Sequence, residues 1–243
     1  MSVAPHIEHE PWVERLYLPS YLQTDVARYV GVTRRTLARW RELFKLPDHG
    51  PVHGTNPAVP SFAELITIAF IAAFRRHGVA LDDVHRMHDT LRSALSDEYP
   101  FTLLAFKTRA PLVLDQLGID NISDLRVVAR HGHYGWAESI LAEFARFDYD
   151  HGLALRWYPH GRDSSIVVDA RIAFGGPTIN GAGIPTHILK QRYVAGETLE
   201  ETAEDFGISV DQLQEALRFE YDRDTVTPEP AQRLSSLAYS VRS

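Results

Sequence analysis

A cluster of cationic side chains near the amino end has the composition of a polyanion-binding site. Between Thr33 and Lys45, five basic residues stand against one acidic residue, which gives a local net charge of five minus one, or +4. The five are Arg34, Arg35, Arg39, Arg41 and Lys45. Guanidinium groups form paired hydrogen bonds with guanine edges, and both guanidinium and ammonium groups bind phosphate oxygens. This segment therefore predicts contact with a nucleic acid.

Two short helices joined at Gly31 would position these side chains. Val26, Ala27 and Val30 give the first helix an apolar stripe, and the small Ala27 allows a second helix to cross closely. Gly31 suits a corner with positive φ, and Thr33 is a good N-cap for the second helix. The pattern predicts a helix-turn-helix, whose second helix typically enters the DNA major groove.

A helical wheel at about 100° per residue separates the core side of this second helix from its outer side. With Leu37 at the inward pole, Trp40 and Phe44 fall on the core side, whereas Arg35 and Arg39 point outward toward base edges. The residues expected on the flank or at the helix start, where they would meet phosphates, are Thr33, Arg34, Arg41 and Lys45. The alternative is a solvated basic face on an ordinary surface helix.

The next segments complete a possible DNA-binding head. Residues 47–57 are rich in turn-forming types and stand where a winged helix-turn-helix carries its wing, so His53 and Asn56 could face the DNA backbone or minor groove. A plain surface loop is the alternative. Apolar residues at three- and four-residue spacing then predict helices over 61–76 and 81–95.

This order of segments resembles the MerR-like winged helix-turn-helix domain over roughly residues 20–92. The resemblance rests on three blocks in matching register: Thr36-Leu37-Ala38-Arg39-Trp40, Phe62-Ala63-Glu64-Leu65, and Arg76-His77-Gly78-Val79-Ala80-Leu81-Asp82-Asp83-Val84. Typical MerR activators continue into a long dimer coiled coil, but no sustained heptads follow here. Metal or drug sensing is therefore not carried over.

Residues 98–165 predict a mixed connecting or dimerisation region. The apolar runs 101–106 and 112–114 indicate a short β-hairpin, and residues 136–147 a helix with Ile140, Leu141, Phe144 and Phe147 on its core side. Residues 154–159 and 166–168 are expected to be strands that could pair with each other.

A second corner repeats the first at an offset of 176 residues. Ala203, Gly207, Ile208, Ser209 and Leu213 fall on Ala27, Gly31, Val32, Thr33 and Leu37. At the two outward positions, however, Asp211 replaces Arg35 and Glu215 replaces Arg39. Because phosphates repel carboxylates, this module is expected to have lost DNA contact and to pack against protein. A merely solvated acidic face is the alternative.

The same block resembles a small family of domains found in antitoxins of bacterial toxin–antitoxin operons, over about residues 166–222. The matching pattern is Asp169-x-Arg171, Gly176-Pro177-Thr178-Ile179-x-Gly181, Gly183-Ile184-Pro185-Thr186, then Gly196 to Gly207. Many members have arginine where Gly183 stands, so a role for that side chain is not transferred. With a MerR-like head, the chain resembles a VapB-type antitoxin, which implies repression of its own operon and neutralisation of a PIN-domain ribonuclease.

The tail after Pro228 is the segment expected to reach such a toxin, whose site would be a carboxylate cluster holding Mg²⁺. A basic side chain could fill that site, and the residues proposed for toxin contact are Arg233, Leu237 and Arg242. A terminus without a role is the alternative.

These patterns predict a mainly α protein with short β-hairpins, acting as a cytoplasmic homodimer. The expected divisions are a MerR-like head over 1–97, a connecting region over 98–165, a small helical helix-turn-helix-like domain over 166–224, and a tail over 225–243. No long apolar run, cysteine, nucleotide loop, serine-nucleophile turn or known histidine metal spacing is present, so no membrane span, cofactor or enzymatic activity is expected. The histidines are expected at the surface. The rival functions are a ligand-responsive MerR-like regulator without a toxin and a protein-binding scaffold without DNA contact.

Overall fold

The computed structural model describes residues 11–47, 60–116, 126–128, 134–136 and 138–221. Five helices come first: α1 (Pro11–Tyr17), α2 (Gln23–Tyr29), α3 (Arg34–Leu43), α4 (Phe62–Arg76) and α5 (Leu81–Leu95). Both helices expected from the 61–76 and 81–95 periodicity are present. In the described part of the chain, no helix is long and apolar enough to cross a membrane.

Helix α4 is the centre of the larger core. Ser61 caps its start by accepting a hydrogen bond from Glu64 N at 3.2 Å. Every residue from Phe62 to Phe74 is buried, as expected for a helix that is apolar on all sides and surrounded by other elements. Helices α1 and α5 pack against it, and α5 buries Val84, Met87 and Leu91 as the spacing predicted.

The region after α5 differs from its predicted hairpin. A 3₁₀ turn, η2 (Pro100–Thr102), leads into helix α6 (Leu104–Gln116). Phe106 and Ala110 lie one turn apart on α6, and both are fully buried in the core around α4. The apolar run thus covers α4 as a helix, and the prediction of two strands here was wrong.

Short strands and one helix follow α6. Strands β1 (Arg126–Val128) and β2 (Tyr134–Trp136) pair with each other, and α7 spans Glu138–Phe144. The helix predicted over 136–147 is therefore shorter. Phe147 begins a strand instead, and Leu141, expected in the core, is 50% exposed.

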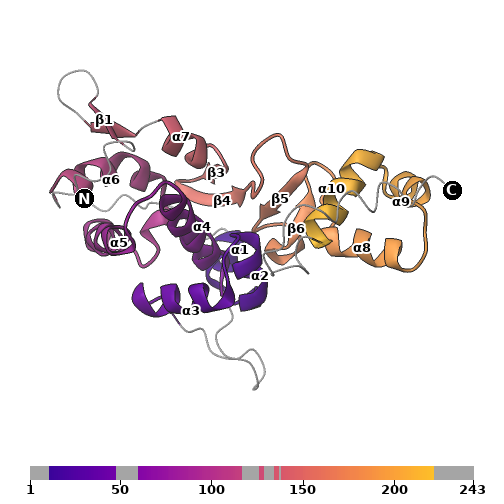
Figure 1. Ribbon diagram of the computed structural model, residues 1–243, viewed down its shortest axis with the longest axis horizontal. Helices are drawn as coiled ribbons and strands as arrows, with labels where there is room; N and C mark the ends of the chain where they lie inside the picture. The colour runs from indigo at the N-terminus through magenta and orange to yellow at the C-terminus, as the bar shows by residue number, and fades with distance from the viewer. Residues whose placement is uncertain (1–10, 48–59, 117–125, 129–133, 137, 222–243) are drawn as a thin grey trace.

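A four-stranded antiparallel sheet crosses the middle of the molecule (Figure 1). Its order is β3 (Phe147–Asp150), β4 (Leu153–Trp157), β5 (Ile166–Asp169) and β6 (Pro177–Ile179). The expected pairing of the strands near 154–159 and 166–168 is present, with Arg156 opposite Asp169. A 3₁₀ turn, η4 (Ala173–Gly175), separates β5 from β6.

Three helices pack beside this sheet to form a second, smaller core. They are α8 (Thr186–Val194), α9 (Leu199–Phe206) and α10 (Val210–Tyr221). Leu189, Leu213 and Ala216 are fully buried together with Ile166 and Ile179 of the sheet. Figure 1 shows the sheet between these helices and α2–α5, so the strands connect the two cores.

Candidate nucleic-acid interface

The first corner has the backbone geometry that its sequence predicts. Gly31 has φ +73°, the left-handed conformation that L side chains rarely adopt. Val32 N then donates to Ala27 O at 2.8 Å, which closes the turn between α2 and α3. Thr33 has extended backbone, and its Oγ1 accepts a hydrogen bond from Thr36 N at 3.1 Å, so the predicted N-cap is confirmed.

Helix α3 presents a cationic outer face. Leu37 is fully buried, and Trp40 and Phe44 are buried beside it, which fixes the rotation of the helix against the core. Five of the predicted contact residues are exposed: Thr33, Arg34, Arg35, Arg39 and Lys45. The structure thus confirms the outward orientation of Arg35 and Arg39 that the helical wheel predicted.

Arg41 departs from its predicted role. Its side chain is buried, its Nε forms an ion pair with Glu64 of α4, and Glu64 is itself fully buried. Arg41 Nη2 also donates to Pro47 O at 3.2 Å. The expectation of a phosphate contact was wrong because this guanidinium group is committed to holding α3 against α4.

The remaining predicted contacts cannot be placed on this surface. His53 and Asn56, expected in a wing, lie outside the described residues, as do Arg233, Leu237 and Arg242 of the tail.

The second corner reproduces the first in atomic detail. Gly207 has φ +64°, and Ile208 N donates to Ala203 O at 3.0 Å. Ser209 Oγ accepts from Gln212 N at 3.1 Å, as Thr33 accepts from Thr36. Leu213, like Leu37, is fully buried. The structure thus confirms the repeated backbone plan.

The two carboxylates on the outer face of α10 differ in exposure, whereas Arg35 and Arg39 of α3 are both exposed. Glu215 accepts hydrogen bonds from Ser164 Oγ at 2.6 Å and Ser165 N at 2.9 Å. Burial by itself would raise the pKa of Glu215, but these hydrogen bonds outweigh it and the pKa is lowered. Glu215 therefore packs against protein, as predicted, whereas Asp211 is exposed.

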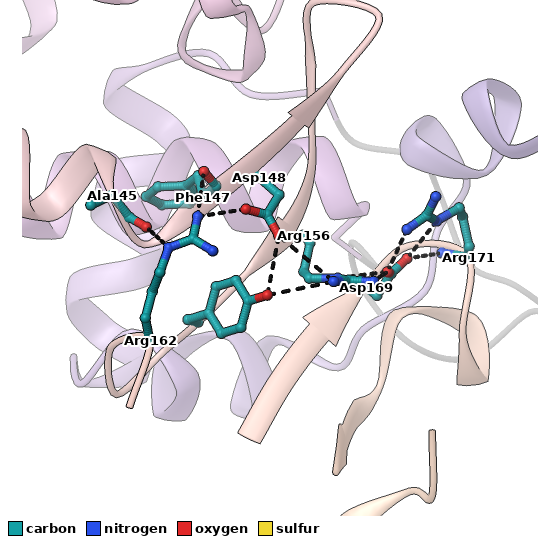
Figure 2. A network of polar contacts seen from close by, with 8 residues as sticks. Ala145, Phe147, Asp148, Arg156, Arg162, Asp169 and Arg171 are labelled. Carbon is teal, nitrogen blue, oxygen red and sulfur yellow. Dashed lines mark hydrogen bonds and ion pairs between the residues drawn. The ribbon is translucent and has the colours of Figure 1, made fainter. Parts of the chain in front are cut away.

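A polar network joins β3, β4 and the turn after β5 (Figure 2). Asp169 is fully buried and accepts from Arg156 Nε at 2.9 Å and from Arg171 Nη2 at 2.9 Å. Burial alone would raise the pKa of Asp169, but the hydrogen bonds from Arg171 and Arg156 outweigh it and hold the pKa below its usual value. Tyr158 Oη continues the network by donating to Asp148 at 3.1 Å.

This network explains the Asp169-x-Arg171 pattern structurally. Two guanidinium groups neutralise one buried carboxylate at the end of β5, where the chain turns toward η4, so the pattern stabilises the fold beside the larger core, which includes Val168 and Ala170. The sequence alone placed Asp169 and Arg171 together, but Arg156 is brought in by the register of β4 and β5.

Two contacts between the first helix-turn-helix and the C-terminal part of the chain were not predicted from the sequence. Tyr21, at the start of the helix-turn-helix, donates its hydroxyl hydrogen bond to Gly175 O in η4 at 2.8 Å. Tyr29 of α2 stacks on Phe219 of α10, with ring centroids 5.9 Å apart. Local patterns could not reveal these pairs because their members lie more than 150 residues apart in the chain.

Comparison with known proteins finds a relative that is named as a putative antitoxin. Residues 166–219 match a family described as "Protein of unknown function (DUF433)". A Mycobacterium tuberculosis (strain ATCC 25618 / H37Rv) protein named "Putative antitoxin VapB45" is 25% identical over 228 residues, 84% of this chain and 94% of the relative. The X-ray crystal structure of Rv2018 from Mycobacterium tuberculosis matches with a TM-score of 0.69 and 25% identity, over 84% of this chain and 99% of that chain. The likeness thus extends well beyond residues 166–219.

Proposed function

We propose that this chain is the antitoxin of a type II toxin–antitoxin pair, which binds its own operator through α3 and neutralises a PIN-domain ribonuclease. The observation that carries the DNA-binding part is the pair Arg35 and Arg39, exposed one turn apart on the outer face of a capped helix-turn-helix. The antitoxin part is supported by the name of the relative that is similar over most of the chain.

The DNA-binding mode proposed here is that of a MerR-like head. Arg35 and Arg39 would enter the major groove and contact base edges, with guanine the preferred partner of arginine. Arg34, Lys45 and the hydroxyl of Thr33 would contact phosphates and fix the register on the duplex. A homodimer would place two copies of α3 in successive major-groove faces, which requires a palindromic operator with half-sites about one helical turn apart.

A binding assay on the DNA upstream of the gene tests this mode. Arg35→Ala should weaken operator binding by about 1–3 kcal/mol and reduce discrimination against mutated operators, because a base-edge contact is lost. Lys45→Ala should instead weaken binding to all sequences evenly and reduce the log–log salt slope by about 0.9. Fluorescence anisotropy over a salt series measures both quantities.

Arg218→Ala is the matched control, because Arg218 is an exposed arginine on α10, in the acidic module. Its operator affinity should equal that of the unmodified protein. If Arg35→Ala and Arg218→Ala had the same affinity as the unmodified protein, α3 would not be the reading helix.

A further inference from the structure

A cavity of about 220 Å³ lies beside the first helix-turn-helix corner. Its walls come from Arg28 to Gly31 at the end of α2, from α4, α7 and β4, and from the segment around His160. A single water needs only about 10–15 Å³ of such space, so the cavity is large enough for a small molecule of a few heavy atoms.

Three guanidinium groups line this cavity against one carboxylate. The cations are Arg28, Arg76 and Arg146, and Glu143 is the acidic residue among the described lining residues. Arg76 Nη2 lies 3.3 Å and Arg146 Nε 3.5 Å from Glu143 Oε2. One carboxylate oxygen is thus shared between two arginines, so each arginine retains donors for another anion.

Arg28 supplies the most buried cation of the site. Its side chain is 17% exposed, and its Nη2 lies 3.0 Å from Asp25 Oδ1 in the same helix. Its buried Nε has no hydrogen-bond acceptor among the described residues. A buried donor without an acceptor costs free energy that an acceptor entering the cavity would recover.

Apolar residues complete the walls of this cavity, which is partly open to solvent. Ala69 and Phe147 line the cavity, and Trp157, also in the lining, is only 4% exposed. Charge-assisted hydrogen bonds are stronger in such partly desolvated surroundings than in water. The combination of clustered arginines with apolar walls is suited to a small anion with several acceptor oxygens.

We propose that this cavity binds a small dianion, either a phosphate or a short dicarboxylate, between Arg28, Arg76 and Arg146. The ligand oxygens would accept from Arg28 Nε and from the arginine donors that Glu143 leaves free. The site is separate from the outer face of α3, because the described residues that line the cavity include none from that helix.

The cavity contacts both the first helix-turn-helix and a segment that packs against α10. Arg28 and Gly31 belong to the helix-turn-helix, whereas the ring of His160 lies 5.3 Å from that of Phe219 on α10. Tyr29 of the cavity wall stacks on the same Phe219. A ligand held here would contact the corner that supports α3, so its occupancy should change operator affinity if the proposed function is correct.

Isothermal titration calorimetry of the full chain with inorganic phosphate, and separately with succinate, tests the site at constant ionic strength set by chloride. We expect saturable binding with one ligand per chain for at least one of the two probes, and the stronger probe identifies the ligand chemistry. Arg28→Gln and Arg76→Gln should each lower that affinity about tenfold or more, because a charged donor is lost.

Two further variants test whether the anion is held inside the cavity itself. Glu143→Gln should tighten binding, since it removes the competing carboxylate, an effect that a purely structural role would not produce. Arg218→Gln should leave anion binding unchanged, because Arg218 is exposed on α10 and lies outside the cavity. Thermal melts identify variants that fail to fold, and Arg76→Gln keeps the test decisive if Arg28→Gln does not fold, because Arg76 is 49% exposed.

The absence of saturable binding for both probes would overturn the proposal, as would equal affinity in the unmodified, Arg28→Gln and Glu143→Gln proteins. This measurement needs no DNA, so it stands apart from the proposed operator binding. If anion binding followed the predicted pattern but the upstream DNA were not bound, the site would be correct and the proposed function wrong.

Discussion

Neighbouring arginines of α3 have opposite roles that depend on where each side chain points. Arg39 is exposed on the outer face, whereas Arg41 is buried against Glu64 of α4. A wheel built from α3 alone places Arg41 on the flank. Its burial depends on a carboxylate from a different helix, which no local pattern specifies.

The Arg41–Glu64 pair should contribute strongly to folding because both partners are buried. Arg41→Ala would leave Glu64 without its cation in the core, and such a loss typically costs about 3–5 kcal/mol. Urea unfolding measures this cost, and Arg39→Ala on the exposed face is the matched control with little expected change. The double variant Arg41→Met, Glu64→Leu should recover much of the stability, since no buried charge remains unpaired. Equal destabilisation by Arg39→Ala and Arg41→Ala would contradict this assignment.

A histidine expected at the surface is instead part of the core. His88 on α5 is fully buried, and its ring meets Phe44 and Phe101 edge-on at centroid distances of 5.3 Å and 5.2 Å. Burial is the main cause that lowers its pKa to about 4, although Asp89 acts in the opposite direction. His88 is therefore neutral at pH 7, packed as an aromatic residue.

Because His88 is buried in its neutral form, we expect the protein to lose stability in mild acid. The folded-state pKa, about 4, is below the ordinary value of 6.5, so the unfolded chain binds more protons between these values. The free energy of unfolding should consequently fall as the pH drops from 6.5 toward 4. His88→Leu should flatten the pH dependence in this window, whereas His187→Leu, at an exposed position on α8, should leave it unchanged. Urea unfolding at successive pH values would refute the prediction if the two variants behaved alike.

At the scale of elements, the two corners share a backbone but differ in charge. The sequence allowed both to be predicted because a small residue, a glycine, a cap and an inward leucine have fixed spacings. Helices α4, α5, α9 and α10 were predictable for the same reason, since their apolar residues follow the helical period. The run 101–106 has no such period, and a continuous apolar run does not distinguish a strand from a helix. Packing against α4, which the sequence does not reveal, favours the helix α6 over a strand.

Charge reversal at the second corner tests whether this module has lost DNA contact. Asp211→Arg places a cation at the position equivalent to Arg35, and Asp211 is exposed, so the fold should tolerate it. We expect operator affinity to change little, because α10 is proposed to lie away from the duplex. Glu215 is unsuitable for this test because its carboxylate holds Ser164 and Ser165. A large gain in operator affinity for Asp211→Arg would place α10 at the DNA.

At the scale of the whole molecule, the charge distribution gives the chain two distinct ends. The overall net charge is −7, yet the segment 33–45 carries +4. Residues 196–224 contain ten acidic and two basic residues, a net charge of −8. Phosphates would attract the first end and repel the second, so the protein should bind DNA with α3 toward the duplex and the α8–α10 module away from it. The second end then remains available for a protein partner.

Removal of residues 228–243 tests whether the tail of the chain binds the proposed ribonuclease toxin. The segment contains Arg233 and Arg242, whose cations would complement a carboxylate site in the proposed ribonuclease, together with the apolar Leu237. If it fills the active site of the proposed ribonuclease partner, the truncated chain should fail to inhibit that ribonuclease, whereas operator binding through α3 should persist. Co-purification and an RNA-cleavage assay measure the first effect, and fluorescence anisotropy measures the second. Full inhibition by the truncated chain would exclude the tail and direct attention to the α8–α10 module, while loss of both activities would indicate a folding defect.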